Sequence, residues 1–205
     1  MLSRLFVFMQ YLLPKYWLTA IVYRLARIRL PAVKNALIRG FLKLYDVRLD
    51  EVSGRVPEDF ATFNEFFIRE LKDGSRPVDP DPGAIVAPAD GTLSQAGVLR
   101  GNRILQAKGI DYTIEDLLAA DVDKAREFDG GVFATIYLAP YNYHRVHAPA
   151  DGELVAAHYV PGDLFSVNAS TAAHVPGLFS RNERLNLHFT TAAGPMVVVL
   201  VGALN

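Results

Sequence analysis

Hydrophobic and polar positions follow two different patterns along this chain. In the first 50 residues, large apolar side chains recur at helical spacing, as in Trp17, Ile21 and Leu25, with basic residues on the other faces. After Gly83, short apolar runs alternate with Gly, Pro and Asp, which is typical of strands joined by turns. The sequence therefore predicts an α+β fold, with N-terminal amphipathic helices (1–52) followed by a β-rich domain (53–205).

The β-rich part contains several more specific elements. A short helix is expected over Phe63–Arg69 and another near Ile114–Arg126, with a turn-rich passage over 73–83. The apolar run from Gly131 to Ala139 predicts a buried strand, and the dense Val and Leu run from Pro195 to Gly202 predicts a second one.

This part of the sequence contains an internal repeat of five residues. Ala-Pro-Ala-Asp-Gly occurs at Ala87–Gly91 and again at Ala148–Gly152, each time after an apolar run. Each copy predicts a turn in which glycine takes a positive φ, and the repetition predicts a duplicated half-barrel or sandwich. Asp151 is expected only to turn the chain, which leaves Asp90 as the carboxylate with a chemical role.

Charge is distributed unevenly, although the net charge is only −1. Up to Arg48 the only acid is Asp46, and the bases are Arg4, Lys15, Arg24, Arg27, Arg29, Lys34, Arg39, Lys43 and Arg48. Basic helices that carry Trp and Tyr suit the surface of an anionic membrane, while packing on the domain is the alternative. No uncharged run approaches the ~20 residues that span a bilayer, and the exposed aliphatic area does not favour nucleic acid.

Two histidines are the main candidates for chemistry. His144 and His147 follow the predicted strand at Gly131–Ala139 and precede the second turn. Imidazole exchanges protons near neutral pH, so two of them at the end of a strand indicate a reaction centre, while ordinary loop histidines are the alternative. A metal site is disfavoured, because no third ligand stands at a suitable spacing and prolines flank the pair. The chain has no cysteine, which excludes disulfides and thiolate chemistry.

Several motifs together resemble the phosphatidylserine decarboxylases, over nearly the whole chain. They are Phe63–Arg69, Pro88–Gly91, Leu105–Gly109, Tyr143–His147, Tyr159–Asn168 and Leu178–Arg184. The resemblance implies a pyruvoyl-dependent enzyme that converts phosphatidylserine to phosphatidylethanolamine through a Schiff base. It also implies a proenzyme that cuts itself before a serine, so that this chain is the β chain and a separate small α chain carries the pyruvoyl group.

The resemblance also implies the roles of individual residues. Asp90 is expected to orient His147, and His147 is expected to be the base that activates the serine for self-cleavage. His144 is expected to donate the proton in decarboxylation or to contact the leaving carboxylate, unless it only shapes the loop. A Gly-Ser pair is expected soon after Asn205, since the only pair in the chain is Gly74-Ser75.

The resemblance further implies a peripheral protein on the cytoplasmic face of the cell membrane, bound to phosphatidylserine, and it leaves open whether the enzyme forms a higher oligomer. Two other classes remain open at this stage. One is a non-catalytic β module that the basic helices tether to a membrane. The other is a metal enzyme in which His144 and His147 are ligands.

Overall fold

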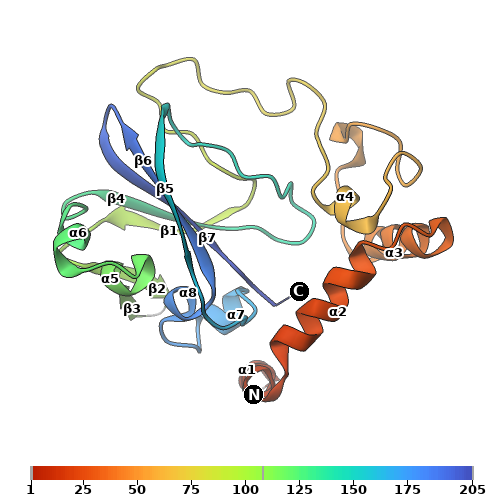
Figure 1. Cartoon of the computed structure of the whole chain (residues 1–205), viewed down its shortest axis with the longest axis horizontal. Coiled ribbons are helices and arrows are strands. Elements are labelled where there is room, and N and C mark those ends of the chain that lie inside the picture. Colours follow the sequence, from red (N-terminus) through yellow and green to blue (C-terminus); the bar gives the residue numbers. More distant parts are fainter. Residues whose placement is uncertain (1, 108, 205) are drawn as a thin grey trace. The chain divides into compact units, whose positions relative to one another are not determined.

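The computed structural model describes residues 2–107 and 109–204 (Figure 1). These residues form two compact units, one from Met1–Thr19, Leu93–Tyr137 and Asp151–Asn205 and the other from Ala20–Thr92 and Leu138–Ala150. The units interleave along the sequence, and their boundaries differ from the predicted division at residue 52. That division stays a prediction.

Three helices open the chain, as the apolar spacing predicted. They are α1 (Leu2–Leu12), α2 (Lys15–Ala26) and α3 (Pro31–Leu44). One face of α1 packs on its own unit, where Val7 is buried and Gln10 bonds to Thr171 Oγ1 and to the backbone of Ser166. No single helix in the described residues is long and apolar enough to span a membrane, although α1 from Leu5 and α2 together have the required length and composition, with a bend of 86° between them.

The first unit contains three small sheets. Strand β1 (Thr92–Val98) pairs with β4 (Val132–Tyr137), and β2 (Arg103–Ala107) pairs antiparallel with β3 (Ile110–Thr113). The third sheet is antiparallel, in the order β5 (Gly152–Val160), β6 (Arg184–Thr191) and β7 (Gly194–Val201). The fold is therefore a mixture of helices and small sheets, as the α+β prediction required.

The single helix expected near Ile114–Arg126 is wrong. Two short helices stand there, α5 (Ile114–Leu118) and α6 (Val122–Arg126). Ala119 ends α5 in the left-handed region at φ 50°, and the Asp121 side chain accepts from Lys124 N–H to begin α6. A left-handed residue followed by a strong N-cap breaks the helical hydrogen bonds, and this local chemistry outweighed the continuous apolar spacing.

The strand at the end of the sequence is confirmed, but its burial differs from the prediction. Most side chains of β7 are half-buried, because β7 is an edge strand with β6 as its neighbour. Two clusters of buried apolar residues form the core of this unit. Val197 and Val199 of β7 pack against one of them, which includes Leu99, Ile104 and Ile114. The other includes Phe165, Val175 and Leu178, near the short helices α7 (Ala169–Ala172) and α8 (Leu178–Arg181).

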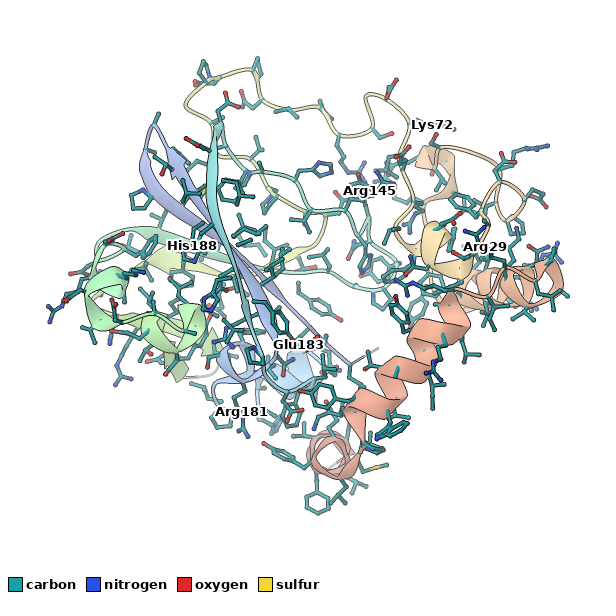
Figure 2. All side chains as sticks on the ribbon, viewed as in Figure 1. Arg29, Lys72, Arg145, Arg181, Glu183 and His188 are labelled. Carbon is teal, nitrogen blue, oxygen red and sulfur yellow. The ribbon has the colours of Figure 1, made fainter. Side chains whose placement is uncertain are left out.

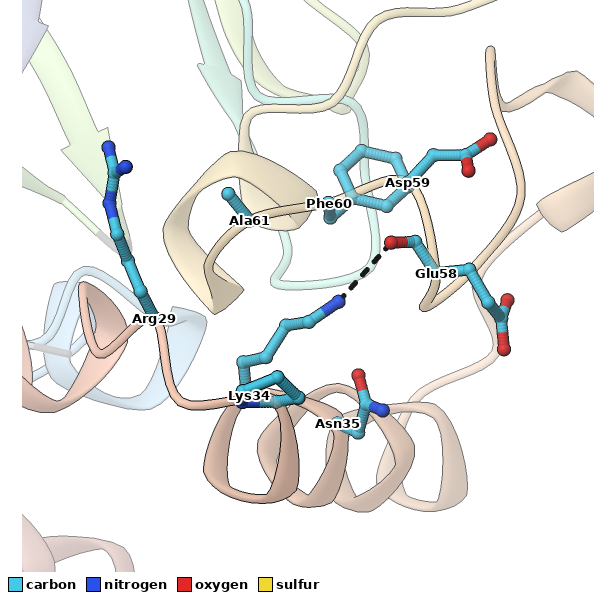
Figure 3. Close-up of a pocket in the computed structure, with 8 residues that line it drawn as sticks. Arg29, Lys34, Asn35, Glu58, Asp59, Phe60 and Ala61 are labelled. Atoms are coloured by element: carbon cyan, nitrogen blue, oxygen red, sulfur yellow. Dashed lines mark hydrogen bonds between the residues drawn. The ribbon is translucent and has the colours of Figure 1, made fainter.

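The second unit is built around α3. Its core consists of Ile38, Val47, Val52, Phe60 and Phe66. The 3₁₀ helix η1 (Leu49–Glu51) and the short helix α4 (Phe63–Phe67) pack around this core, and α4 confirms the helix predicted there. Lys34 joins α3 to the next loop, since its buried ammonium donates to Pro57 O at 2.7 Å. It also donates to Glu58 O at 3.4 Å, the bond drawn in Figure 3.

Candidate functional site

Helix α4 packs beside the loop that carries the histidines. Thr62 caps the helix by accepting from Glu65 N–H at 3.0 Å, and the Glu65 carboxylate reaches back to Ala61 N–H at 2.9 Å. Such reciprocal capping satisfies donors that the first turn leaves without partners. Phe66 is fully buried and fixes the helix in the core of the unit. Phe67 is therefore held in place by a short helix that is capped at its start and fixed in the core by Phe66.

Two arginines join the end of α4 to the histidine loop, Leu138–Ala150. Nη2 of Arg69, which is buried, donates to Tyr141 O at 3.0 Å and to Asn142 O at 3.2 Å. In the opposite direction, Arg145, which is labelled in Figure 2, donates to Ile68 O at 2.9 Å. Because each segment sends one guanidinium to backbone carbonyls of the other, the motifs Phe63–Arg69 and Tyr143–His147 form one structural unit.

His144 is half-buried, and its ring lies 4.1 Å from that of Phe67, centroid to centroid. Its Nδ1 lies 2.8 Å from Asn142 O, and since a carbonyl oxygen can only accept, Nδ1 carries the hydrogen and Nε2 keeps its lone pair. Burial lowers the pKa of His144, the hydrogen bond to Asn142 O opposes that shift, and the positive charge of Arg69 adds to it. The ring is therefore neutral at pH 7.

His147 is exposed, and it contacts Tyr143. The two rings stack with centroids 5.6 Å apart, and the Tyr143 hydroxyl lies 3.0 Å from Nε2 of His147. A hydroxyl that donates to Nε2 requires the tautomer with its hydrogen on Nδ1. That tautomer is the one in which Nε2 can act as a base while Nδ1 donates to a carboxylate.

The two Ala-Pro-Ala-Asp-Gly copies are paired through their backbones. Val86 N–H donates to Pro149 O at 2.8 Å, and His147 N–H donates to Pro88 O at 2.8 Å. Val86 and His147 are equivalent residues, each standing directly before its copy, so the two bonds are related by the repeat and the copies run antiparallel. This pairing places the backbone of His147 against the turn that carries Asp90.

The chain bends at both predicted turns, over 88–91 and 149–151, but the predicted backbone conformation of their glycines is wrong. Neither Gly91 nor Gly152 is among the described glycines with positive φ. At Gly152 the requirement is space instead, since a Cβ there would lie 2.7 Å from Thr190 O on the neighbouring strand. Close backbone approach, rather than left-handed backbone, explains this glycine.

The Asp90 carboxylate is held by an arginine that the sequence did not single out. Arg76 Nε donates to Oδ1 at 2.7 Å and Arg76 Nη2 donates to Oδ2 at 2.5 Å, a bidentate pair. The same Nη2 donates to Glu51 Oε2 at 2.9 Å. Hydrogen bonding to Arg76 lowers the pKa of Asp90 against the opposing effect of partial burial, and the charges of Arg76, Arg48 and Arg69 lower it further. Asp90 is therefore ionised at neutral pH.

The three predicted site residues, Asp90, His144 and His147, all lie in the second unit. Within the part of the chain that the structure describes, no side-chain hydrogen bond joins Asp90 to His147, and the orienting role of Asp90 stays a prediction. Sequence reasoning missed the partners Arg69, Arg76 and Tyr143. Arg69 and Tyr143 stand in motifs that carried the resemblance, whereas nothing in the sequence pairs Arg76 with Asp90.

Among the residues that the structure describes, hollows are also found away from the histidine loop. One, of about 510 Å³, lies in the second unit and is lined by Arg29, Pro31, Lys34, Asn35, Glu58, Asp59, Phe60 and Ala61 (Figure 3). The other, of about 460 Å³, lies in the first unit and is lined by Val7, Phe8, Tyr11, Ile110, Ala173 and His174. Neither is lined by a predicted site residue. The described residues contain no group of three or more His, Cys, Asp or Glu that would hold a metal ion.

Comparison with known proteins identifies the family. Residues 63–205 match the family model of phosphatidylserine decarboxylase, and residues 5–46 match a model described as PSD. The phosphatidylserine decarboxylase proenzyme of Methylococcus capsulatus is 50% identical over 201 residues, which are 98% of this chain and 70% of that protein. The proenzyme of Hahella chejuensis is 47% identical over 98% of this chain and 68% of its own length, and that of Azotobacter vinelandii is 48% identical over 100% and 71%. The chain therefore belongs to the phosphatidylserine decarboxylase family.

Proposed function

We propose that this chain is the larger part of an enzyme that removes the carboxylate of phosphatidylserine as CO₂ and leaves phosphatidylethanolamine. Its relatives are named as phosphatidylserine decarboxylase proenzymes, which agrees with a mature enzyme formed from a longer precursor. The observation that carries the proposal is the histidine loop, in which His144 and His147 have different partners and so suit two different reactions.

The residues of this loop fit a pyruvoyl group supplied by a separate small chain. A keto amide is uncharged, and it needs neighbours that bind the substrate's charges and move protons. Arg69 Nε and Nη1 are buried and have no hydrogen-bond partner within the described residues, and Nη2 shares the Asn142 carbonyl with His144. When bound, the pyruvoyl group supplies an electron sink for the pair that the departing CO₂ leaves behind.

In decarboxylation, the residues of this chain bind the substrate and move one proton. The fixed charge of Arg69 favours an anionic headgroup near the loop. Loss of CO₂ leaves an electron pair on the α-carbon, and a proton must replace the carboxylate. His144 delivers that proton from Nε2 in its protonated form, after Nε2 has taken the proton up from solvent, while its Nδ1–H stays bonded to Asn142 O. Its lowered pKa makes its protonated form a stronger acid than an ordinary imidazolium.

In self-cleavage, His147 takes the proton of a serine hydroxyl on the precursor. The Tyr143 hydroxyl lies 3.0 Å from Nε2, so a hydroxyl can reach this nitrogen at hydrogen-bond distance, as the reaction requires. Asp90, ionised and next to the backbone that bonds to His147, stabilises the imidazolium that forms. Attack of the serine oxygen on the preceding carbonyl exchanges the peptide bond for an ester. The two chains separate when β-elimination then releases the upstream chain as its carboxylate, and hydrolysis of what remains on the small chain leaves its pyruvoyl group.

We also propose that the β-rich part is a duplicated half-barrel or sandwich that the small α chain completes. The reciprocal bonds between Val86 and Pro149 and between His147 and Pro88 agree with an internal duplication. Strand β5 is exposed along nearly its whole length, and Leu154, Val155 and Tyr159 are 52%, 57% and 56% exposed. Apolar side chains in that number on one strand favour a covering partner.

A final element of the proposal is peripheral attachment to the cytoplasmic face of the cell membrane through α1 and α2. Leu12 is 72% exposed and Trp17 is 75% exposed, and Phe8 and Tyr16 are exposed beside them in the sequence. Basic side chains near an anionic surface contribute about 1 kcal/mol each and are screened by salt, whereas buried apolar area is not. Binding to anionic vesicles should therefore weaken only in part as salt rises.

Point substitutions test the attachment better than deletion, because removing the segment also removes the buried Val7 and Gln10. Leu12→Ser with Trp17→Ser should reduce sedimentation with vesicles that contain phosphatidylserine. The control is Val132→Ser, an equally exposed position on β4 (74%). Complete release by salt would overturn the proposal that buried apolar side chains contribute to binding. Equal binding to phosphatidylcholine vesicles would overturn the proposal that anionic lipid is required.

Mass spectrometry of the protein expressed from its full reading frame tests the proposed function. The expected result is a second, smaller chain whose N-terminus is blocked by pyruvoyl, together with release of CO₂ from phosphatidylserine vesicles. An unprocessed chain without decarboxylase activity would favour the non-catalytic membrane module instead. Bound zinc or iron that is required for activity would favour a metal enzyme.

A further inference from the structure

We propose that Arg76 is a positioning residue for self-cleavage, which holds the Asp90 carboxylate in the orientation and the ionised state that His147 requires. The inference rests on the proposed function, because it assumes that Asp90 and His147 act on the serine. It adds a residue that neither the resemblance nor the family match assigns, and that lies outside every motif that identified the family.

The fold brings Arg76 to Asp90 by a defined route. Segment 51–53 pairs with segment 70–72 through a bridge between Val52 and Leu71, and Lys72 N–H donates to Glu51 O at 2.8 Å. The following turn, with Gly74 at φ +78°, sends the chain back so that Arg76 reaches Glu51. Val52 is 1% exposed and lies in the core of the unit, so the pairing of these two segments is anchored in that core.

The contact itself is well suited to orient a carboxylate. Two nitrogens of one planar guanidinium bind two oxygens of Asp90, at 2.7 and 2.5 Å, and this fixes the plane of the carboxylate as well as its position. The Asp90 side chain is 24% exposed and that of Arg76 is 37% exposed. A carboxylate with this clamp on one side still has lone pairs with which to accept from a histidine.

Arg76 also separates two negative charges. Its Nη2 donates both to Asp90 Oδ2 and to Glu51 Oε2, so those two oxygens lie no farther apart than the two bonds together, 2.5 and 2.9 Å, allow. Without Arg76 the two carboxylates would face each other, and like charges at such a distance disfavour ionisation of the pair. The other charged groups that act on Asp90 are Arg48 and Arg69.

The test is the rate of self-cleavage of the full-length proenzyme against pH, followed on gels for five variants. Arg76→Gln should cleave about 10- to 100-fold more slowly, the usual cost of losing a group that orients another. The fall in its cleavage rate at acid pH, here called the acid limb of the pH profile, should move to higher pH. The reason is that Asp90 then faces Glu51 without a cation between them. Arg76→Lys should keep the acid limb near that of the wild type but cleave more slowly, because an ammonium cannot bind both oxygens in one plane.

Glu51→Gln in the Arg76→Gln background separates an electrostatic role from a purely structural one. The double variant should bring the acid limb back towards lower pH while the rate stays low. Arg48→Gln is the matched control, because Arg48 is exposed and pairs with Glu51 rather than with Asp90, and it should move the limb less than Arg76→Gln.

Three results decide the inference. An unchanged pH profile in Arg76→Gln, at any rate, would overturn it and leave Arg76 as an ordinary structural ion pair. If Arg76→Gln fails to fold, the rate of Arg76→Lys decides in its place, and a wild-type rate there overturns the proposal. Normal cleavage of Asp90→Ala would instead sink the proposed role of Asp90, and with it the premise of this inference.

Discussion

The two copies of Ala-Pro-Ala-Asp-Gly have the same sequence and equivalent backbone bonds, yet their side chains have different surroundings. Each copy receives a hydrogen bond from the residue before the other copy, Val86 to Pro149 O and His147 to Pro88 O. Asp90 in the first copy is clamped by Arg76. Asp151 in the second copy is exposed and has no side-chain hydrogen bond or ion pair among the described residues.

Under the proposed mechanism, this difference lets a repeated backbone support chemistry that is not repeated. The first copy contributes a carboxylate and has Val86 where the second has a histidine. The second copy contributes His147, and its own aspartate only accompanies the turn into β5. The paired backbones hold the two segments together, and the proposal is that non-repeated neighbours such as Arg76 and Tyr143 determine which side chain has a role. The following predictions test this asymmetry, from the largest expected effect to the smallest.

The largest effect is expected at His147, whose equivalent before the first copy is Val86 and not a histidine. His147→Ala should leave the proenzyme uncut, with cleavage slowed by about 10⁴- to 10⁶-fold, because nothing else takes the serine proton. Gels of the full-length protein measure this directly. His158→Ala, on β5, is the control and should be processed at the normal rate. Normal processing of His147→Ala would refute its role as the base.

The two aspartates should differ by a smaller but still large factor. Asp90→Ala should slow cleavage by about 10³- to 10⁴-fold, and Asp90→Asn should be processed only in part, since an amide stabilises imidazolium poorly. Asp151→Ala should be processed like the wild type. Equal effects of the two alanine substitutions would contradict the asymmetry and mean that both aspartates serve the turn.

His144 should affect the second reaction and not the first. His144→Ala should keep self-cleavage but lose about 10²- to 10⁴-fold in decarboxylation, the range for a positioned acid. In the wild type the protonated ring is the donor, so the rate should fall as pH rises through the lowered pKa of His144. This fall in the decarboxylation rate should occur at lower pH than for an ordinary histidine. A normal decarboxylation rate in His144→Ala would show that the residue only shapes the loop.

The smallest effect concerns the glycine of the second copy. Gly152→Ala should destabilise the fold by about 1–3 kcal/mol, because its Cβ would press on Thr190 O at 2.7 Å. Thermal unfolding measures this, with Gly40→Ala in α3 as the control, since a Cβ there meets nothing within 4 Å. Cleavage in the folded fraction should be unchanged. A Gly152→Ala protein as stable as the wild type would show that the β5–β6 contact yields easily.

Much of the fold follows from local patterns in the sequence. Helical spacing of apolar residues predicted the N-terminal helices and α4, and dense Val and Leu predicted β7. The errors arose where a few atoms outweighed the pattern. Ala119 and Asp121 split one predicted helix into two, and Thr190 O rather than a left-handed backbone explains Gly152. Such contacts depend on side-chain caps and on neighbouring strands, which periodicity does not represent.

The sequence by itself determined the family and the identity of the candidate groups, because Asp90, His144 and His147 stand in motifs whose order and spacing are specific. Only the tertiary structure decided what these groups contact. It placed Arg76 on Asp90, Tyr143 on His147, and both Phe67 and the Asn142 carbonyl on His144. The physical reason is that protonation state and orientation depend on burial, on charges and on hydrogen-bond partners. Arg76 and Phe67 come from segments far from the groups they contact, so only folding brings them together.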